Sequence, residues 1–120
     1  MKRMRVLVIE DVAEMLEMIC LFLNESENYK ITGRAQNLWE ARNCILKNRP
    51  DFVLLDEILP GESALDYINE LIEQQIPVVL MTSVSNPVHP IAKGALGRVQ
   101  KSESKSFVDE INKLTIDHKS

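Results

Sequence analysis

The chain has 120 residues; 45% of them are hydrophobic and 27% are charged, with fourteen basic against eighteen acidic side chains. This length suits one domain with a core of its own, so we expect a single domain over residues 1–120. The net charge of −4 argues against direct binding of nucleic acid, and the apolar run near the N-terminus is too short for a signal peptide or a membrane span. We therefore expect a cytoplasmic protein that contacts neither nucleic acid nor a membrane.

Strands and helices alternate along the first half of the chain. The dense apolar run at residues 4–10 predicts a strand that is covered on both faces. A helix follows, because apolar residues from Val12 to Leu23 recur at helical spacing. A weaker run at residues 29–35 predicts the second strand, and the second helix is indicated by Leu38, Ala41 and Ile45.

The second half of the chain repeats this alternation of strands and helices, but the helix between the fourth and fifth strands is only weakly indicated. Runs at residues 51–56 and 77–82 predict the third and fourth strands, and a weaker run at 97–100 predicts the fifth. The fourth helix must be short, roughly residues 87–93, because Pro87 and Pro90 fit only in its first turn. The third helix should bury Leu65, Ile68 and Ile72, and the last, capped by Ser104, should bury Phe107, Val108, Ile111 and Leu114.

This order of elements predicts an α/β fold in which a five-stranded parallel sheet carries helices on both faces. In open sheets of this kind, functional groups gather beyond the carboxyl ends of the strands. The strand ends deliver three carboxylates, a hydroxyl and an ammonium to that edge, from Glu10, Asp11, Asp56, Thr82 and Lys101. We expect these five side chains to form one site.

Three neighbouring carboxylates repel one another unless a cation compensates their charge. Mg²⁺ is the cation that fits these residues most simply, because it takes oxygen ligands and bridges to phosphate oxygens. Asp56 beside such an ion can attack a phosphoryl group and form an aspartyl phosphate, while Thr82 and Lys101 stabilise the developing charge. In this interpretation Glu10 and Asp11 bind the metal; capping of the following helix is the plainer alternative.

The sequence resembles the receiver domain of two-component response regulators over essentially the whole chain. Four blocks in order carry the resemblance: the acid pair in VIED, the segment LLDEILPG, the strand ending VVLMTS and a lysine after the fifth strand. The resemblance implies a flavodoxin-like strand order, 2-1-3-4-5, and transfer of a phosphoryl group to Asp56 from a histidine kinase or a histidine phosphotransfer protein. It also implies that the backbone carbonyl of Ile58 completes the Mg²⁺ site, that Thr82 is the switch hydroxyl and that Lys101 contacts the phosphate.

Two positions depart from the family pattern. Arg98 stands three residues before the lysine, where the family has an aromatic switch residue that turns inward on activation, so we expect an atypical switch. Ser102 replaces the usual cis proline, and because a cis bond before serine costs about 2.5–4 kcal/mol, we expect a trans bond. Ile58 and Val84 flank the expected phosphate with apolar side chains that cannot orient a water molecule, which predicts a long-lived acyl phosphate.

The resemblance further implies that the first helix forms the docking surface for the phosphodonor, with Glu14, Met15 and Met18 on it. Met18 and Leu21 are expected to be exposed there, and incidental exposure of these two residues is the plainer alternative. No basic output segment follows the last helix, so the downstream partner is expected to be an unknown protein or a missing output domain.

Two other functions compete with phosphorylation-switched signalling. Arg98 and Ser102 favour a receiver-like interaction module that works without phosphorylation, whereas the complete set of acids, hydroxyl and lysine opposes it. A phosphatase with an aspartyl-phosphate intermediate would need a second acid two residues beyond Asp56, where Ile58 stands. The leading interpretation is a signalling domain that catalyses only its own phosphorylation and dephosphorylation and is not a conventional enzyme.

Overall fold

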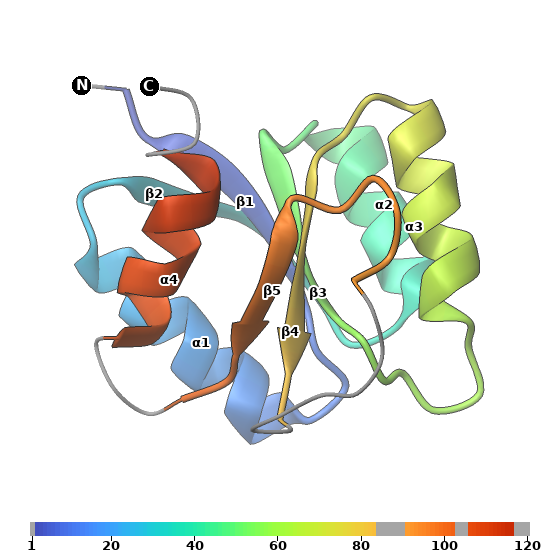
Figure 1. The fold of residues 1–120 in the computed structure, drawn as a ribbon, viewed down its shortest axis with the longest axis horizontal. Helices are drawn as coiled ribbons and strands as arrows, with labels where there is room; N and C mark the ends of the chain where they lie inside the picture. Colours follow the sequence, from blue (N-terminus) through green and yellow to red (C-terminus); the bar gives the residue numbers. More distant parts are fainter. Residues whose placement is uncertain (1, 84–90, 103–105, 117–120) are drawn as a thin grey trace.

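The computed structural model describes residues 2–83, 91–102 and 106–116, and it confirms the predicted α/β architecture. Five parallel strands form one sheet in the order β2-β1-β3-β4-β5. The described helices cover both faces of this sheet, α1 and α4 on one side and α2 and α3 on the other (Figure 1). The strands are β1 (Met4–Ile9), β2 (Tyr29–Ala35), β3 (Phe52–Asp56), β4 (Val78–Thr82) and β5 (Gly97–Gln100). The helices are α1 (Ala13–Glu25), α2 (Leu38–Lys47), α3 (Ala64–Glu73) and α4 (Ser106–Thr115).

Side chains of the central strands alternate between two apolar cores, one on each face of the sheet. In β3, Leu54 belongs to the core beneath α1 and α4, and Leu55 belongs to the core beneath α2 and α3. Every residue of β3 and β4 is buried, which is why both strands read as continuous apolar runs. Because the strands are parallel, their carboxyl ends all lie at one edge of the sheet.

The apolar face of α3 differs from the predicted one. Leu65 and Ile72 are 57% and 37% exposed, whereas the helix buries Tyr67, Ile68 and Leu71. The predicted buried face was rotated about the helix axis, because the prediction left out Tyr67. The ring of Tyr67 fills the core as a large hydrophobic residue does. Val12 is likewise 48% exposed at the start of α1, although the predicted stripe began with it.

Side-chain caps fix where two helices begin. The side chain of Asn37 accepts a hydrogen bond from the backbone N–H of Glu40 at 2.9 Å, which starts α2. Ser63 accepts from the backbone N–H of Asp66 at 3.2 Å and starts α3 directly after the loop that leaves β3. The cap at Ser63 therefore determines how much chain separates Asp56 from the next helix.

The connection between β4 and β5 is where the fold departs from a regular helix–strand alternation. Most of the short helix predicted at roughly residues 87–93 lies outside the described residues, and the described part, 91–93, is not helical. The predicted cap Ser104 also lies outside the described residues. The predicted trans bond before Ser102 is confirmed, since the described peptide bonds include no cis bond. Among the described segments, no helix is both long and apolar enough to cross a membrane.

Candidate functional site

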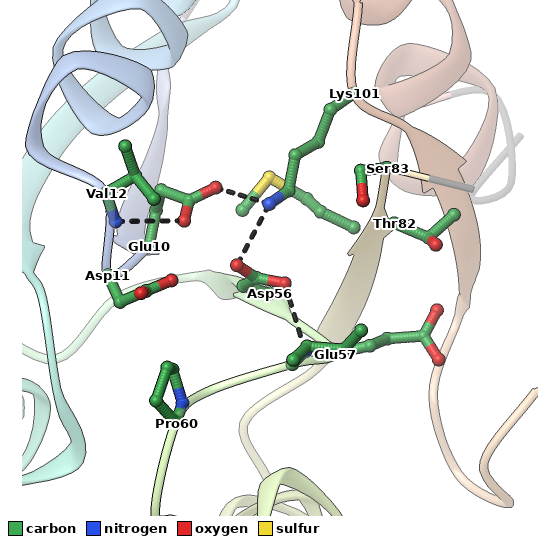
Figure 2. Close-up of a pocket in the computed structure, with 11 residues that line it drawn as sticks. Glu10, Asp11, Val12, Asp56, Glu57, Pro60, Thr82, Ser83 and Lys101 are labelled. Carbon is green, nitrogen blue, oxygen red and sulfur yellow. Dashed lines mark hydrogen bonds and ion pairs between the residues drawn. The ribbon is translucent and has the colours of Figure 1, made fainter.

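A pocket of about 220 Å³ lies at the carboxyl edge of the sheet, where the sequence predicted the functional groups to gather. Residues from the ends of β1, β3, β4 and β5 line it, and Figure 2 shows their side chains converging from opposite sides. The predicted residues among them are Glu10, Asp11, Asp56, Ile58, Thr82 and Lys101. The structure therefore brings together all the side chains predicted for phosphoryl transfer and metal binding.

Glu10 and Asp11 follow β1 without a break and reach the pocket from one side. The N–H of Glu10 donates to the carbonyl of Ala35 at 2.9 Å, so the backbone of the first acid is still held by β2. The Glu10 side chain has no exposed surface, and its Oε2 accepts from the N–H of Val12 at 3.2 Å. Val12, the N-cap residue of α1, forms no side-chain cap. The Glu10 carboxylate is thus buried at the pocket and bonded to the backbone at the start of α1.

Asp56 is the last residue of β3 and is 5% exposed. Its Oδ1 accepts a hydrogen bond from the N–H of Ile58 at 3.0 Å, which fixes the carboxylate against the turn that follows. Its Oδ2 faces the ammonium of Lys101 at 2.9 Å. The carboxylate is thus oriented by its neighbours and still borders the pocket.

The three acids suit a divalent cation. One carboxylate oxygen from each of Glu10, Asp11 and Asp56 lies within 4.8 Å of the others. Burial raises the pKa of the Glu10 carboxyl, and the nearby Asp56 adds to this rise against the opposing effect of Lys101. The Oε1 atom of Glu10 is buried and lies against the ammonium of Lys101. A cluster of three carboxylates that offers only oxygen ligands fits Mg²⁺.

Lys101 brings the opposite charge into this cluster. Its backbone N–H donates to the carbonyl of Thr82 at 2.7 Å, which ties the end of β5 to β4. Its ammonium pairs with Oε1 of Glu10 at 2.5 Å and with Oδ2 of Asp56 at 2.9 Å. Burial alone would lower the pKa of Lys101, but the two carboxylates outweigh it, and the pKa is raised. Lys101 therefore stays charged beside Glu10 and Asp56.

Two hydroxyl residues at the end of β4 complete the pocket. Thr82 is 7% exposed, while Ser83 lies at the surface, and both line the pocket. Both residues lie across the pocket from Asp11 in Figure 2, and the Thr82 side chain is directed away from Asp56.

Arg98, the residue at the predicted switch position, lies inward. Its side chain is 9% exposed and forms a two-pronged ion pair with Glu57: Nε pairs with Oε1, and Nη2 donates to Oε2 at 2.9 Å. This hydrogen-bonded pairing raises the pKa of Arg98 further. The sequence reasoning missed Glu57 as the partner of Arg98. The pairing depends on the register of the sheet, which places Glu57 and Arg98 on one face on either side of β4.

The remaining predicted residues lie around the pocket. The Ile58 side chain is 67% exposed beside Asp56, whereas Val84 lies outside the described residues. On α1, Glu14 is exposed and Met15 and Met18 are half-buried, so Met18 is less open than predicted. Leu21, 57% exposed on the same helix, is the more accessible apolar side chain.

Comparison with known proteins gives one family. The family model of the response regulator receiver domain matches residues 6–112. A protein-glutamate methylesterase/protein-glutamine glutaminase of Caulobacter vibrioides is 31% identical over 86 residues, which are 71% of this chain and 25% of that protein. The phosphate regulon transcriptional regulatory protein PhoB of Escherichia coli is 35% identical over 83 residues, 66% of this chain and 35% of PhoB. The chain thus spans about a quarter to a third of the length of these relatives.

Solved structures share the fold. The response regulator domain of Thermotoga maritima CheB superposes with a TM-score of 0.77 at 20% identity, covering 94% of each chain. CheY6 of R. sphaeroides, solved in complex with the P1 domain of CheA3, matches with a TM-score of 0.77 at 22% identity, again over 94% of each chain. At these identities the likeness shows the fold alone.

Proposed function

This chain belongs to the response regulator receiver domain family, and on that basis we propose that it accepts a phosphoryl group on Asp56 from a histidine kinase or a histidine phosphotransfer protein. The proposal treats residues 1–120 as one receiver domain of two-component signalling. The observation that carries it is the pairing of Lys101 with both Asp56 and Glu10 inside one pocket. A turn aspartate without a chemical task needs neither burial nor a buried cation beside it.

The metal part of the proposal assigns Mg²⁺ to Glu10, Asp11 and Asp56. We add the backbone carbonyl of Ile58 as a fourth protein ligand, because Ile58 lines the pocket and its N–H already bonds to Asp56. When bound, Mg²⁺ supplies positive charge for phosphoryl oxygens and for the crowded carboxylates. The close spacing of the three carboxylates supports this assignment.

In the proposed reaction, a carboxylate oxygen of Asp56 attacks the phosphorus of a phosphohistidine. An O–P bond forms while the P–N bond breaks, and its electron pair stays on the imidazole that leaves. Lys101 exchanges its contact with Asp56 for a phosphoryl oxygen, and the Thr82 hydroxyl donates a hydrogen bond to another. Hydrolysis of the acyl phosphate later restores the Asp56 carboxylate and releases inorganic phosphate.

The partners follow from the phosphodonor. We propose that its helices dock on α1 beside the pocket, over Glu14, Met15 and Met18, with Leu21 extending that surface. The complex of CheY6 with the P1 domain of CheA3 supports a partner of this kind, because CheY6 has the same fold. The downstream partner is a protein or an output domain, and a cytoplasmic location fits the two free cysteines.

A second candidate function, a receiver-like interaction module without phosphorylation, is favoured by one observation. Arg98 is already held inward by Glu57, so the position of the family's aromatic switch is occupied by a paired charge. This observation concerns how the chain would respond to phosphorylation. It does not affect the acids, Thr82 and Lys101, which the proposal assigns to phosphoryl transfer.

Incubation with Mg²⁺ and acetyl phosphate, followed by intact mass measurement, separates the two candidates. We expect one added phosphoryl group on the wild-type chain and none on Asp56→Asn. An Asp66→Asn variant is the matched control, since Asp66 lies in the first turn of α3 and outside the pocket. An unmodified wild-type chain would favour the module that works without phosphorylation.

A further inference from the structure

Glu57 is an acid next to Asp56 that the proposed reaction leaves without a role. Its N–H donates to the carbonyl of Met81 at 3.0 Å, so the backbone continues the ladder of β3 one residue beyond Asp56. Successive side chains of an extended strand point to opposite faces, which turns Glu57 away from the side on which Asp56 lies. Figure 2 shows the Glu57 carboxylate directed away from Asp56 and Lys101.

Arg98 reaches that carboxylate from the other side of β4. In the sheet register, Arg98 pairs with Leu80, and Leu80 pairs with Leu55. Leu55 and Leu80 belong to the core beneath α2 and α3, so Arg98 and Glu57, two residues after Leu55, lie on that same face. The fork of the guanidinium then spans β4 and binds both oxygens of Glu57.

The charges around the pocket explain why this arrangement matters. Glu10, Asp11, Asp56 and Glu57 bring four carboxylates to one edge, and Lys101 neutralises only part of that charge. A phosphodonor is itself an anion, so every uncompensated carboxylate near Asp56 raises the barrier to its approach.

We infer that Arg98 is a positioning residue for phosphoryl transfer: it fixes the Glu57 carboxylate on the face of the sheet opposite Asp56 and cancels its charge. The inference rests on the proposed function, since it assigns Arg98 to the same site. The ion pair is mostly buried, with side-chain exposures of 9% for Arg98 and 23% for Glu57, so solvent screens it weakly. Arg98 thereby gives an electrostatic task to the position that the family fills with an aromatic ring.

A double-mutant cycle tests this role with Arg98→Met, Glu57→Gln and the two combined. The first measurement is the initial rate of phosphorylation by acetyl phosphate in saturating Mg²⁺, followed by intact mass. The second is the affinity for Mg²⁺ alone, measured by calorimetry without a phosphodonor. Melting curves of all the variants establish which are folded, because removing one partner of a buried pair destabilises the protein.

We expect Arg98→Met to slow phosphorylation and to tighten Mg²⁺ binding, each by roughly threefold to tenfold, because the freed Glu57 adds negative charge to the pocket. Glu57→Gln should change either quantity by less than about twofold, and the double variant should match Glu57→Gln. Raising the salt concentration should shrink the rate defect of Arg98→Met, since salt screens the freed charge. If Arg98 acted only through packing, neither the Glu57→Gln substitution nor added salt would restore the phosphorylation rate of Arg98→Met.

Three outcomes overturn the inference: a wild-type rate in Arg98→Met, a double variant as slow as Arg98→Met, or a defect that salt does not change. If Arg98→Met does not fold, Arg98→Lys takes its place, because it keeps the charge and loses only the fork. The inference then requires a phosphorylation rate within about twofold of wild type, and a slower folded Arg98→Lys chain overturns it. A wild-type chain that takes no phosphoryl group sinks the proposed function instead, so the two failures are distinguishable.

Discussion

The ammonium of Lys101 lies 2.5 Å from Oε1 of Glu10, a carboxylate with no exposed surface. These two residues follow strands at opposite sides of β3 and are 91 positions apart, so only the completed sheet brings them together. A buried carboxylate requires a compensating charge, and Lys101 supplies it. The site is therefore assembled by the fold itself.

Replacing Lys101 by methionine should destabilise the metal-free chain by about 3 kcal/mol, because Glu10 and Asp56 would then lie buried without a cation. Mg²⁺ should restore more stability to this variant than to the wild type, since the ion would replace the lost charge. Phosphorylation by acetyl phosphate should fall by about a hundredfold. Urea unfolding with EDTA or Mg²⁺ and intact mass measure these effects.

Lys30→Met is the control for that experiment, because Lys30 is exposed on β2, away from the pocket. It should change stability by less than about 0.5 kcal/mol and leave phosphorylation unaltered. Equal Mg²⁺ stabilisation of Lys101→Met and wild type would show that the lysine and the metal do not compensate the same acids.

Thr82→Ala should slow phosphorylation about tenfold without weakening Mg²⁺ binding, because the hydroxyl is assigned to phosphoryl oxygens and not to the metal. Ser83→Ala is the neighbouring control, since Ser83 lies at the surface, and its effect should stay below about twofold. Rates from intact mass and Mg²⁺ affinities from calorimetry give both comparisons. A larger loss in Ser83→Ala would mean that the second hydroxyl is the one in use.

Ile58→Asn should shorten the lifetime of the acyl phosphate several-fold, because an amide beside Asp56 can orient the attacking water that isoleucine cannot. The lifetime is measured by following loss of the phosphoryl group after removal of acetyl phosphate. Leu65→Asn provides the matched control: Leu65 is 57% exposed on α3 and does not line the pocket, whereas Ile58 is 67% exposed and does. If Ile58→Asn decays at the wild-type rate, the apolar side chain does not limit hydrolysis.

Tyr67→Phe should reduce the loss of stability that the protein undergoes at alkaline pH. Burial, with a smaller contribution from Glu70, raises the pKa of Tyr67 to about 12. This folded pKa lies above the ordinary value near 10. The contribution of Tyr67 to the free energy of unfolding is therefore complete below about pH 10 and is lost as the pH rises toward 12, and the loss amounts to about 3 kcal/mol. The difference in unfolding free energy between wild type and variant, measured in urea at about pH 8 and about pH 11, isolates this residue.

The same substitution should cost nothing at neutral pH, since the Tyr67 hydroxyl makes no hydrogen bond within the described residues. Tyr29→Phe is the contrasting control, because its hydroxyl bonds to Asn112 at 2.7 Å and to Thr115 at 2.9 Å. Tyr29→Phe should lose about 1 kcal/mol at neutral pH. The account of Tyr67 fails if Tyr67→Phe loses as much stability at neutral pH as Tyr29→Phe does. It also fails if the stability of Tyr67→Phe falls in alkali as steeply as that of the wild type.

The sheet and its acidic edge could be predicted from the sequence because each depends on local pattern. Short apolar runs identify strands buried on both faces, and the acid that ends such a run must lie at the carboxyl edge of a parallel sheet. Glu10, Asp11 and Asp56 follow this rule, and so does Lys101 after the weaker fifth strand.

The contacts that depend on side-chain direction could not be read in the same way. The buried face of α3 was misassigned because an amphipathic tyrosine reads as neither core nor surface from spacing alone. The pairing of Arg98 with Glu57 required the register across three strands as well as their order. Mutual burial of two opposite charges is a property of packing, which hydrophobic periodicity does not encode.

The most direct test of the central claim is to locate the phosphoryl group after treatment with acetyl phosphate. Borohydride reduces an aspartyl phosphate to homoserine, and peptide mass mapping identifies the residue that has changed. We predict homoserine at position 56 in Mg²⁺ and unreduced Asp56 in EDTA. A phosphorylated chain with an intact Asp56, or the same yield of homoserine without a divalent ion, would contradict the account.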